Sequence, residues 1–363
     1  MRVDNLVICP HLLHNILVMR FVLTIFLLLL FISCERNINT ETDDFIRGVD
    51  LSWVTEQEAD GVKFYDKDGI EKDCFDLLHS EGANLVRLRV WVDSENDYCE
   101  VEDVVAKAKR AQKAGMSVML DFHYSDWFAD PSRQDKPKSW ANLSFGDLVN
   151  SVTNHTIDVL TILKNENISP KWVQMGNETR NGMLFNDGYL WKNNQDWKSY
   201  ITLSNAGYDA VKCIFPEVEV IVHINNAWEC ESTLWWFEEF IKNGGKVDVL
   251  GLSHYPQTER SLTWEQMNAY CFQTVRSLNE RFDKSVLLCE IGTKSNNINL
   301  ATCIIKQLSD TLRTIDGCLG YCYWEPQVYG NWKPSIYKEL GWNAYDMGAF
   351  TSDGRPSDIF KVW

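Results

Sequence analysis

Short apolar segments alternate with amphipathic segments along most of the chain. Eight of the apolar segments are short enough for strands and rich in the branched and aromatic residues typical of buried strands. They are Phe45–Ser52, Asn84–Val92, Met116–Tyr124, Lys171–Gly176, Glu219–Ile224, Val247–Ser253, Ser285–Glu290 and Cys318–Trp324. The segments between them have helical spacing. In residues 102–115, for example, Val104, Ala108 and Ala111 recur on one helix face, and Gly115 ends the helix.

This order of elements predicts one closed parallel barrel of the (β/α)8 type, in the α/β class. Eight strand–helix units follow one another without a break in composition, which suits closure of the sheet. We expect the barrel to occupy residues 45–363, after a polar linker at 35–44, and to end in a helix at Pro356–Val362. The alternative is an open doubly wound sheet, but no G-x-G-x-x-G loop follows the first strand.

A segment with the features of an export signal precedes the linker. Residues 19–34 have a short basic start, then about a dozen apolar residues, and end in Ser33-Cys34. The pattern is similar to a bacterial lipobox, so Cys34 is the predicted lipidation site. We expect translation to start at Met19, which makes residues 1–18 an extra N-terminal extension. The competing interpretation is a single internal apolar anchor.

This segment predicts an exported protein, lipid-anchored to the bacterial cell envelope or surface, or otherwise secreted. The formal net charge of −16 argues against nucleic acid and against an anionic membrane surface as partners, since both favour basic patches. Membrane contact is therefore expected only through Cys34.

Tryptophan is abundant, with 15 residues, and many of them fall in predicted loops. The flat apolar faces of tryptophan suit sugar rings, and its N–H group can serve sugar hydroxyls. Any single tryptophan more often packs a core or a helix–sheet contact. The concentration in loops nevertheless favours a cleft that binds sugar.

Polar side chains gather where the predicted strands end, which is where parallel barrels carry their chemistry. The second strand places Arg87 and Arg89 on one face, and buried arginines need carboxylate partners. The other polar or aromatic residues near strand ends are Asp50, Ser52, Trp91, Asp121, His123, Asp126, Trp127, Asn177, Glu178, His223, His254, Tyr255, Glu290 and Trp324.

Two glutamates in this set end strands on opposite sides of the predicted barrel. Glu178 ends the fourth strand and Glu290 the seventh. Two carboxylates flanking a bond, one acid and one nucleophile, are what retaining glycoside hydrolysis requires, at a separation of about 5–5.5 Å. A less polar surrounding would favour a protonated Glu178, while Arg87 and the Tyr255 hydroxyl would favour an ionised Glu290. One such glutamate is more often a surface charge, but the combination predicts a glycosidase.

The chain resembles glycoside hydrolase family 53, the endo-β-1,4-galactanases, from "RGVDLSW" to "MGAFTSDGRPSDIF". The most specific pieces are "NLVRLRVWVD", "LDFHYSDWFADPSRQDKPKSW", "MGNETRNGML" and "YCYWEPQV". The resemblance implies that Glu178 is the general acid/base and Glu290 the nucleophile. Asn177 would hold the sugar 2-hydroxyl, and Arg87 and Tyr255 would orient Glu290. The further sugar contacts that it implies are His123, Trp324, Asp126, Trp127, Trp91 and His254.

The activity implied by the resemblance is retaining hydrolysis of internal β-1,4-galactosidic bonds in pectic (arabino)galactan, by a monomer that needs no cofactor. Some bacterial members of the family bind calcium near strands seven and eight, but the sequence shows no clear cluster of acidic ligands there, so no metal site is predicted. Two alternatives stay open. One is a related retaining β-glycanase acting on mannan or cellulose, and the other is a non-catalytic glycan-binding surface lipoprotein.

Overall fold

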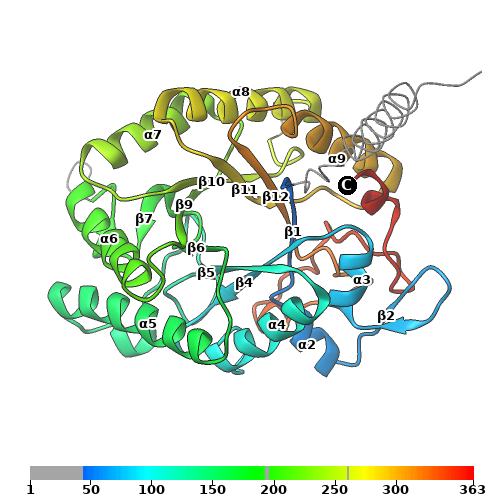
Figure 1. The fold of residues 1–363 in the computed structure, drawn as a ribbon, viewed down its shortest axis with the longest axis horizontal. Helices are drawn as coiled ribbons and strands as arrows, with labels where there is room; N and C mark the ends of the chain where they lie inside the picture. The colour runs from blue at the N-terminus through cyan, green and yellow to red at the C-terminus, as the bar shows by residue number, and fades with distance from the viewer. Residues whose placement is uncertain (1–43, 193–195, 260) are drawn as a thin grey trace, which may run out of the picture. The chain divides into compact units, whose positions relative to one another are not determined.

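A computed structural model of the chain describes residues 44–192, 196–259 and 261–363, and Phe45–Trp363 forms one compact unit. Its centre is a closed barrel of parallel strands (Figure 1). Around the barrel, neighbouring strands follow the order β1 (Ile46–Asp50), β12 (Cys318–Trp324), β11 (Val286–Ile291), β10 (Val249–His254), β9 (Glu219–Ile224), β6 (Trp172–Met175), β5 (Ser117–Phe122) and β4 (Leu85–Val90). Each lies within two residues of its predicted place, so the predicted (β/α)8 barrel is confirmed.

Helices follow the strands and surround the barrel (Figure 1). The longer ones are α3 (Cys74–Ser80), α4 (Val101–Ala114), α5 (Phe145–Asn165), α6 (Trp197–Ile214), α7 (Cys230–Lys242), α8 (Trp264–Phe282) and α9 (Ile298–Leu312). The helix expected at 102–115 is α4, and Gly115 ends it in the left-handed conformation with φ of 90°.

Several short elements decorate the loops of the described part of the chain. They are α2 (Val54–Ala59), α10 (Ser335–Glu339), the 3₁₀ helices η1 (Lys138–Trp140) and η2 (Thr179–Asn181), and the two-residue strands β2 (Phe64–Tyr65), β3 (Glu71–Lys72), β7 (Gly182–Met183) and β8 (Gly188–Tyr189). The expected helix at Pro356–Val362 is instead a 3₁₀ helix, η3 (Asp358–Val362). Ser357 caps it, and the five remaining residues are too few for a stable α-helix.

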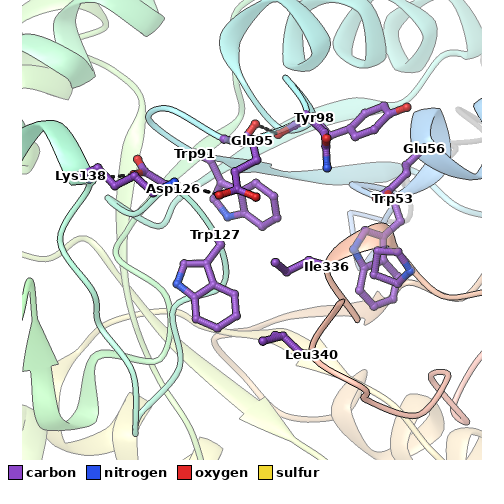
Figure 2. Close-up of a pocket in the computed structure, with 13 residues that line it drawn as sticks. Trp53, Glu56, Trp91, Glu95, Tyr98, Asp126, Trp127, Lys138, Ile336 and Leu340 are labelled. Carbon is purple, nitrogen blue, oxygen red and sulfur yellow. Dashed lines mark hydrogen bonds and ion pairs between the residues drawn. The ribbon is translucent and has the colours of Figure 1, made fainter. Parts of the chain in front are cut away.

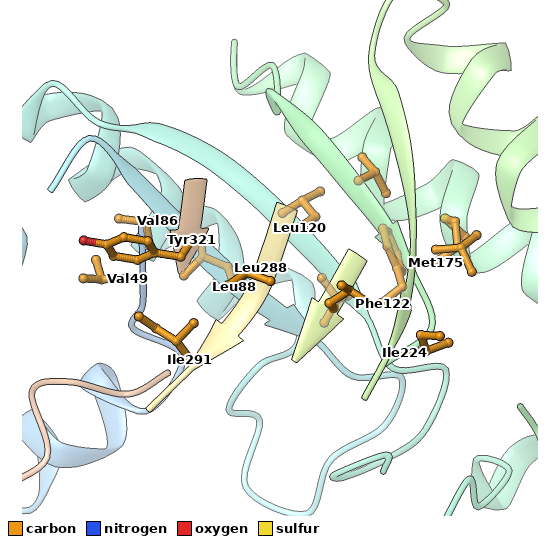
Figure 3. Close-up of a cluster of buried hydrophobic side chains, with 14 of the residues drawn as sticks. Val49, Val86, Leu88, Leu120, Phe122, Met175, Ile224, Leu288, Ile291 and Tyr321 are labelled. Atoms are coloured by element: carbon orange, nitrogen blue, oxygen red, sulfur yellow. The ribbon is translucent and has the colours of Figure 1, made fainter. Parts of the chain in front are cut away.

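The alternation of side chains along the strands divides the core into two layers. Outward residues such as Val86 and Leu88 of β4 belong to the large cluster that also includes residues from the helices (Figure 3). Inward residues near the strand starts, among them Leu85 and Met119, form a smaller second cluster. Further along the same inward face β4 carries Arg87, which is also buried. The inner layer is therefore apolar near the strand starts and polar near the strand ends.

Strand β11 departs from regular alternation just before its end. Leu252 of β10 pairs with Leu288, but the next residue, Ser253, pairs with Glu290, so Cys289 is an extra residue. The pairing of β11 with β12 is irregular over the same stretch. A bulge of this kind changes the direction of the side chains that follow it. Glu290 consequently faces the barrel interior, whereas regular alternation would have turned it toward the helices.

None of the helices within the described ranges is long and apolar enough to cross a membrane. Residues 19–34, including Cys34, and linker residues 35–43 lie outside the described ranges. The predictions of an export signal and of lipidation therefore stay predictions.

A substitution at Gly320 of β12 would test how closely β12 packs against β1. Its φ is 129°, and a Cβ atom there would collide with the Ile46 backbone. Gly320→Ala should therefore lower the free energy of unfolding by at least about 2 kcal/mol, measured by urea denaturation. Gly61 is the matched control, because its φ is 83° but a Cβ would have nothing within 4 Å. Gly61→Ala should cost only about 1 kcal/mol, and equal costs for the two variants would contradict the packing argument.

Candidate active site

Arg87 lies at the centre of a buried polar cluster inside the barrel mouth. Its side chain is 1% exposed, and its guanidinium contacts carboxylates from three other strands. The contacts are to Asp50 at 2.7 Å, Asp121 at 2.8 Å and Glu290 at 3.0 Å. Burial opposes the charge of Arg87, but the three carboxylates raise its pKa well above the usual value. One permanent cation thus holds three acidic side chains together in a water-poor site.

Asp121 and His123 form one side of this cluster. Burial alone would raise the pKa of Asp121, but Arg87 and His123 lower it to about 2, so Asp121 stays ionised. His123 Nδ1 receives hydrogen bonds from the Ala129 N–H at 3.0 Å and the Trp91 N–H at 3.4 Å. The ring proton must therefore sit on Nε2, which donates to Asp121 at 3.0 Å. Burial lowers the pKa of His123, which keeps the ring neutral.

Gln174 and Asn177 come from β6 and from the residue pair that follows it. The Gln174 side-chain oxygen accepts from Arg87 Nη2 at 3.1 Å, and its amide donates to Asp121. The Asn177 side-chain oxygen accepts from Arg87 at 2.8 Å, and its amide nitrogen donates to the Ala129 carbonyl at 2.9 Å. The Asn177 amide is thus held in one orientation while it lines the cavity described below.

Glu290 has a partner on each carboxylate oxygen. Arg87 contacts Oε1 at 3.0 Å, and the Tyr255 hydroxyl donates to Oε2 at 2.8 Å. Burial raises the pKa of Glu290 above its ordinary value, and Arg87 and the Tyr255 hydrogen bond both limit that rise. These two contacts stabilise the ionised form, which is the form a nucleophile requires.

Glu178 has a different environment. Its backbone adopts the left-handed conformation, with φ of 47°, which is uncommon for a residue with a Cβ and recurs at functional sites. Burial and the charge of Glu290 raise the pKa of Glu178 to about 8, although a hydrogen bond from Ser253 opposes the shift. Glu178 therefore keeps its proton at neutral pH, as a general acid must.

The two glutamates line one cavity of about 210 Å³. Six of the predicted site residues line it: His123, Asn177, Glu178, Tyr255, Glu290 and Trp324. Arg87 does not line this cavity and acts through Glu290 and Asn177, which do. Trp324 is held edge-on by Trp53, at 4.9 Å between ring centroids, and by Tyr345, at 4.8 Å.

A second cavity of about 280 Å³ lies at the ends of β1, β4 and β5 (Figure 2). Trp53, Trp91 and Trp127 line it, together with Ile336 and Leu340 from the segment after β12. The predicted sugar contacts Trp91 and Trp127 are therefore brought together here rather than beside the glutamates.

Asp126 also lines the second cavity, but its carboxylate has structural partners. One oxygen accepts from the Asp93 N–H at 3.1 Å and the other from the Lys138 N–H at 2.8 Å (Figure 2 shows the latter pair). Asp126 thus joins the loop after β4 to the segment of η1.

His254 is the predicted sugar contact that the structure places elsewhere. Its side chain is fully buried, and its Nε2 lies 2.8 Å from the Asn268 side-chain oxygen of α8. The preceding residue, Ser253, points inward to His223, at 2.8 Å. Alternation along β10 therefore turns His254 toward the helix layer, away from both cavities.

Two residues of the site, Gln174 and Glu325, are not among those predicted from the sequence. Gln174 links Arg87 to Asp121. The sequence indicates it only in that Gln174 is a polar residue within an otherwise apolar strand. Glu325 is the partner of Arg89, at 3.0 Å, and both are buried. Burial and the charge of Asp50 raise the pKa of Glu325 to about 8. The unpaired second arginine in "VRLRV" was the signal that a further carboxylate had to exist.

No group of three or more His, Cys, Asp or Glu side chains in the described part of the chain is arranged to hold a metal ion.

Glu178→Gln should stabilise the fold at alkaline pH. An unfolded chain ionises a glutamate near pH 4.3, whereas the folded protein keeps Glu178 protonated to about pH 8. Holding this proton lowers the free energy of unfolding. The loss is absent below the pKa of the glutamate in the unfolded chain and grows as the pH rises to the pKa of Glu178 in the folded protein. We expect the Tm of the variant to match the wild type at about pH 4 and to exceed it by roughly 2–4 °C at about pH 8. An equal Tm at both pH values would contradict the raised pKa.

Comparisons with known proteins show the family to which this chain is similar. The model of glycosyl hydrolase family 53 matches residues 46–316. The arabinogalactan endo-beta-1,4-galactanase of Cellvibrio japonicus (strain Ueda107) is 38% identical over 220 residues, which cover 59% of this chain and 57% of that protein. An uncharacterized protein in the bgaB 5′ region of Niallia circulans is 32% identical over 320 residues, covering 80% of this chain and 85% of that protein.

Among solved structures, the GH53 catalytic domain of Ignisphaera aggregans superposes with a TM-score of 0.77 at 30% identity, covering 88% of this chain and 95% of that one. The resemblance noted in the sequence is thus confirmed by a family match over most of the barrel and by a similar solved fold. The chain belongs to glycosyl hydrolase family 53.

Proposed function

We propose that this protein is a retaining endo-β-1,4-galactanase that hydrolyses internal bonds of pectic (arabino)galactan. The observation that carries the proposal is the pair of glutamates in one cavity, with Glu178 protonated at neutral pH and Glu290 held by Arg87 and Tyr255. The substrate class is supported by relatives named as arabinogalactan endo-beta-1,4-galactanases. The mannan or cellulose alternative is tested by the experiment below.

In the first step of the proposed reaction, Glu290 attacks the anomeric carbon while Glu178 protonates the leaving oxygen. The bond to the leaving sugar breaks and a covalent bond to Glu290 forms. Arg87 and Tyr255 stabilise the Glu290 carboxylate before the attack. In the covalent intermediate Glu290 has lost its negative charge, so it no longer repels an ionised Glu178 and the pKa of Glu178 falls. Glu178 is then ionised and ready to act as a base.

In the second step, the ionised Glu178 removes a proton from water, which attacks the anomeric carbon and releases Glu290. Two displacements at one carbon restore the original configuration. We propose that Asn177 holds the sugar 2-hydroxyl, and the support is that Arg87 and Ala129 fix its amide. We propose that Trp91 and Trp127 contact further sugars in the second cavity.

The test measures reducing ends released from β-1,4-galactan, β-mannan and carboxymethyl cellulose by the chain beginning at Glu35. The wild type should act on galactan. Glu178→Gln and Glu290→Ala should each lower kcat on galactan by at least about 100-fold, because one removes the acid and the other the nucleophile. An aryl β-galactoside with a good leaving group needs less protonation, so Glu178→Gln should lose less activity on it than Glu290→Ala.

Near-wild-type turnover of galactan by either variant would contradict the assigned roles. Activity on mannan or cellulose alone would keep the two-glutamate mechanism and replace the substrate. Retention of galactan without any cleavage would favour the binding lipoprotein.

We further propose that the protein is exported and lipid-anchored through Cys34. The support is the apolar segment at 19–34 that ends in Ser33-Cys34. Cys34→Ala should abolish labelling by a fatty-acid analogue in the producing cell. Cys213→Ser, which changes an exposed cysteine of the barrel unit, should leave the labelling unchanged. Labelling that persists in Cys34→Ala would exclude this anchor.

A further inference from the structure

Two tryptophan side chains lie exposed beside each other outside both cavities. Trp191, which follows β8, is 42% exposed, and Trp235 of α7 is 37% exposed. Their ring centroids are 6.3 Å apart and their planes differ by 19°. Rings in face-to-face contact would be closer, at about 3.5–4 Å. The two rings are therefore offset and nearly parallel, and we call them the Trp191/Trp235 platform.

Neighbouring side chains hold the platform in place. Trp197, which is largely buried, packs edge-on against Trp235 at 6.2 Å between ring centroids. The Trp191 N–H donates to the Asn181 side-chain oxygen at 2.6 Å. A binding surface whose rings are fixed in advance loses little side-chain entropy when a ligand binds. Exposed apolar patches on a protein surface often mark sites of interaction.

Hydrogen bonds connect the platform and its neighbour Trp236 to the segment that follows the proposed acid. Asn181, the partner of Trp191, belongs to η2, which begins directly after Glu178. Trp236, the neighbour of Trp235, donates to the Arg180 carbonyl of the same segment at 2.8 Å. In the proposed reaction Glu178 protonates the leaving oxygen, so the leaving part of the chain lies on the Glu178 side of the cleaved bond. These contacts link the platform to the segment that follows the acid, which is the segment nearest to the leaving side.

We propose that the Trp191/Trp235 platform binds the leaving portion of a long galactan chain, beyond the sugar next to the cleaved bond. A galactopyranose ring has one face rich in C–H groups, and such a face packs on an indole ring, while its hydroxyls remain in water. Two offset rings offer contact to successive sugars of one chain. This inference rests on the proposed function, and it adds a site that would favour polymeric over short substrates.

The experiment compares Trp191→Ala, Trp235→Ala and the double variant with the wild type on long β-1,4-galactan and on galactotriose. For the double variant, the ratio of kcat/KM on galactan to kcat/KM on galactotriose should fall by roughly fivefold or more. Tyr270→Ala is the matched control, since Tyr270 is 41% exposed on α8. Its ratio should equal that of the wild type.

A second variant separates stacking from positioning of η2. Trp191→Phe keeps an aromatic face but removes the hydrogen bond to Asn181, so it should retain most of the wild-type ratio. An equal fall of kcat/KM on both substrates, or an unchanged ratio in the double variant, would overturn the platform. A wild-type dimer that the double variant converts to monomer, seen by light scattering without galactan, would also overturn it in favour of an interface between copies.

Failure of the proposed function would be seen in the wild type, whereas failure of the platform would be seen only in the double variant. A wild type that leaves galactan intact removes both the proposed function and the platform that rests on it. A wild type that cleaves galactan, with an unchanged ratio in the double variant, removes the platform alone.

Discussion

The buried contacts between Arg87 and three carboxylates are the constraint on which the site depends. Asp50, Asp121 and Glu290 come from three different strands and all lie 2.7–3.0 Å from one guanidinium. Without that cation, three like charges would face one another in a place that water barely reaches. Because arginine does not lose its proton in proteins, the cation that joins β1, β4, β5 and β11 at the barrel mouth keeps its charge.

The same cation separates the acidities of the two glutamates. Contact with Arg87 favours the charged form of Glu290, and burial together with that charge raises the pKa of Glu178 to about 8. The asymmetry therefore begins with Arg87, which contacts Glu290 directly and does not line the cavity. Two chemically identical side chains can in this way serve as acid and nucleophile in one cavity.

The barrel could be predicted from sequence because its information is local and repeated. Val86 and Leu88 alternate with Arg87 in β4, and similar apolar segments recur through the chain. The strand-end glutamates could be predicted because all parallel strands of a barrel end at one mouth. Pairings between distant residues could not be predicted, because no local pattern connects them. Glu325, for example, lies 236 residues from its partner Arg89. The direction of His254 depends on the register of β10, which no local pattern fixes.

Because of the bulge at Cys289, the direction of the Glu290 side chain depends on how β11 pairs with its neighbours and not only on which residue stands at position 290. One extra residue in β11 decides whether this carboxylate meets Arg87 or the helix layer. Point substitutions cannot transplant such an arrangement into another barrel, because the donor strand must bring its additional residue with it. In recombined barrels, β11 would therefore have to be exchanged together with β10 and β12, against which its register is set.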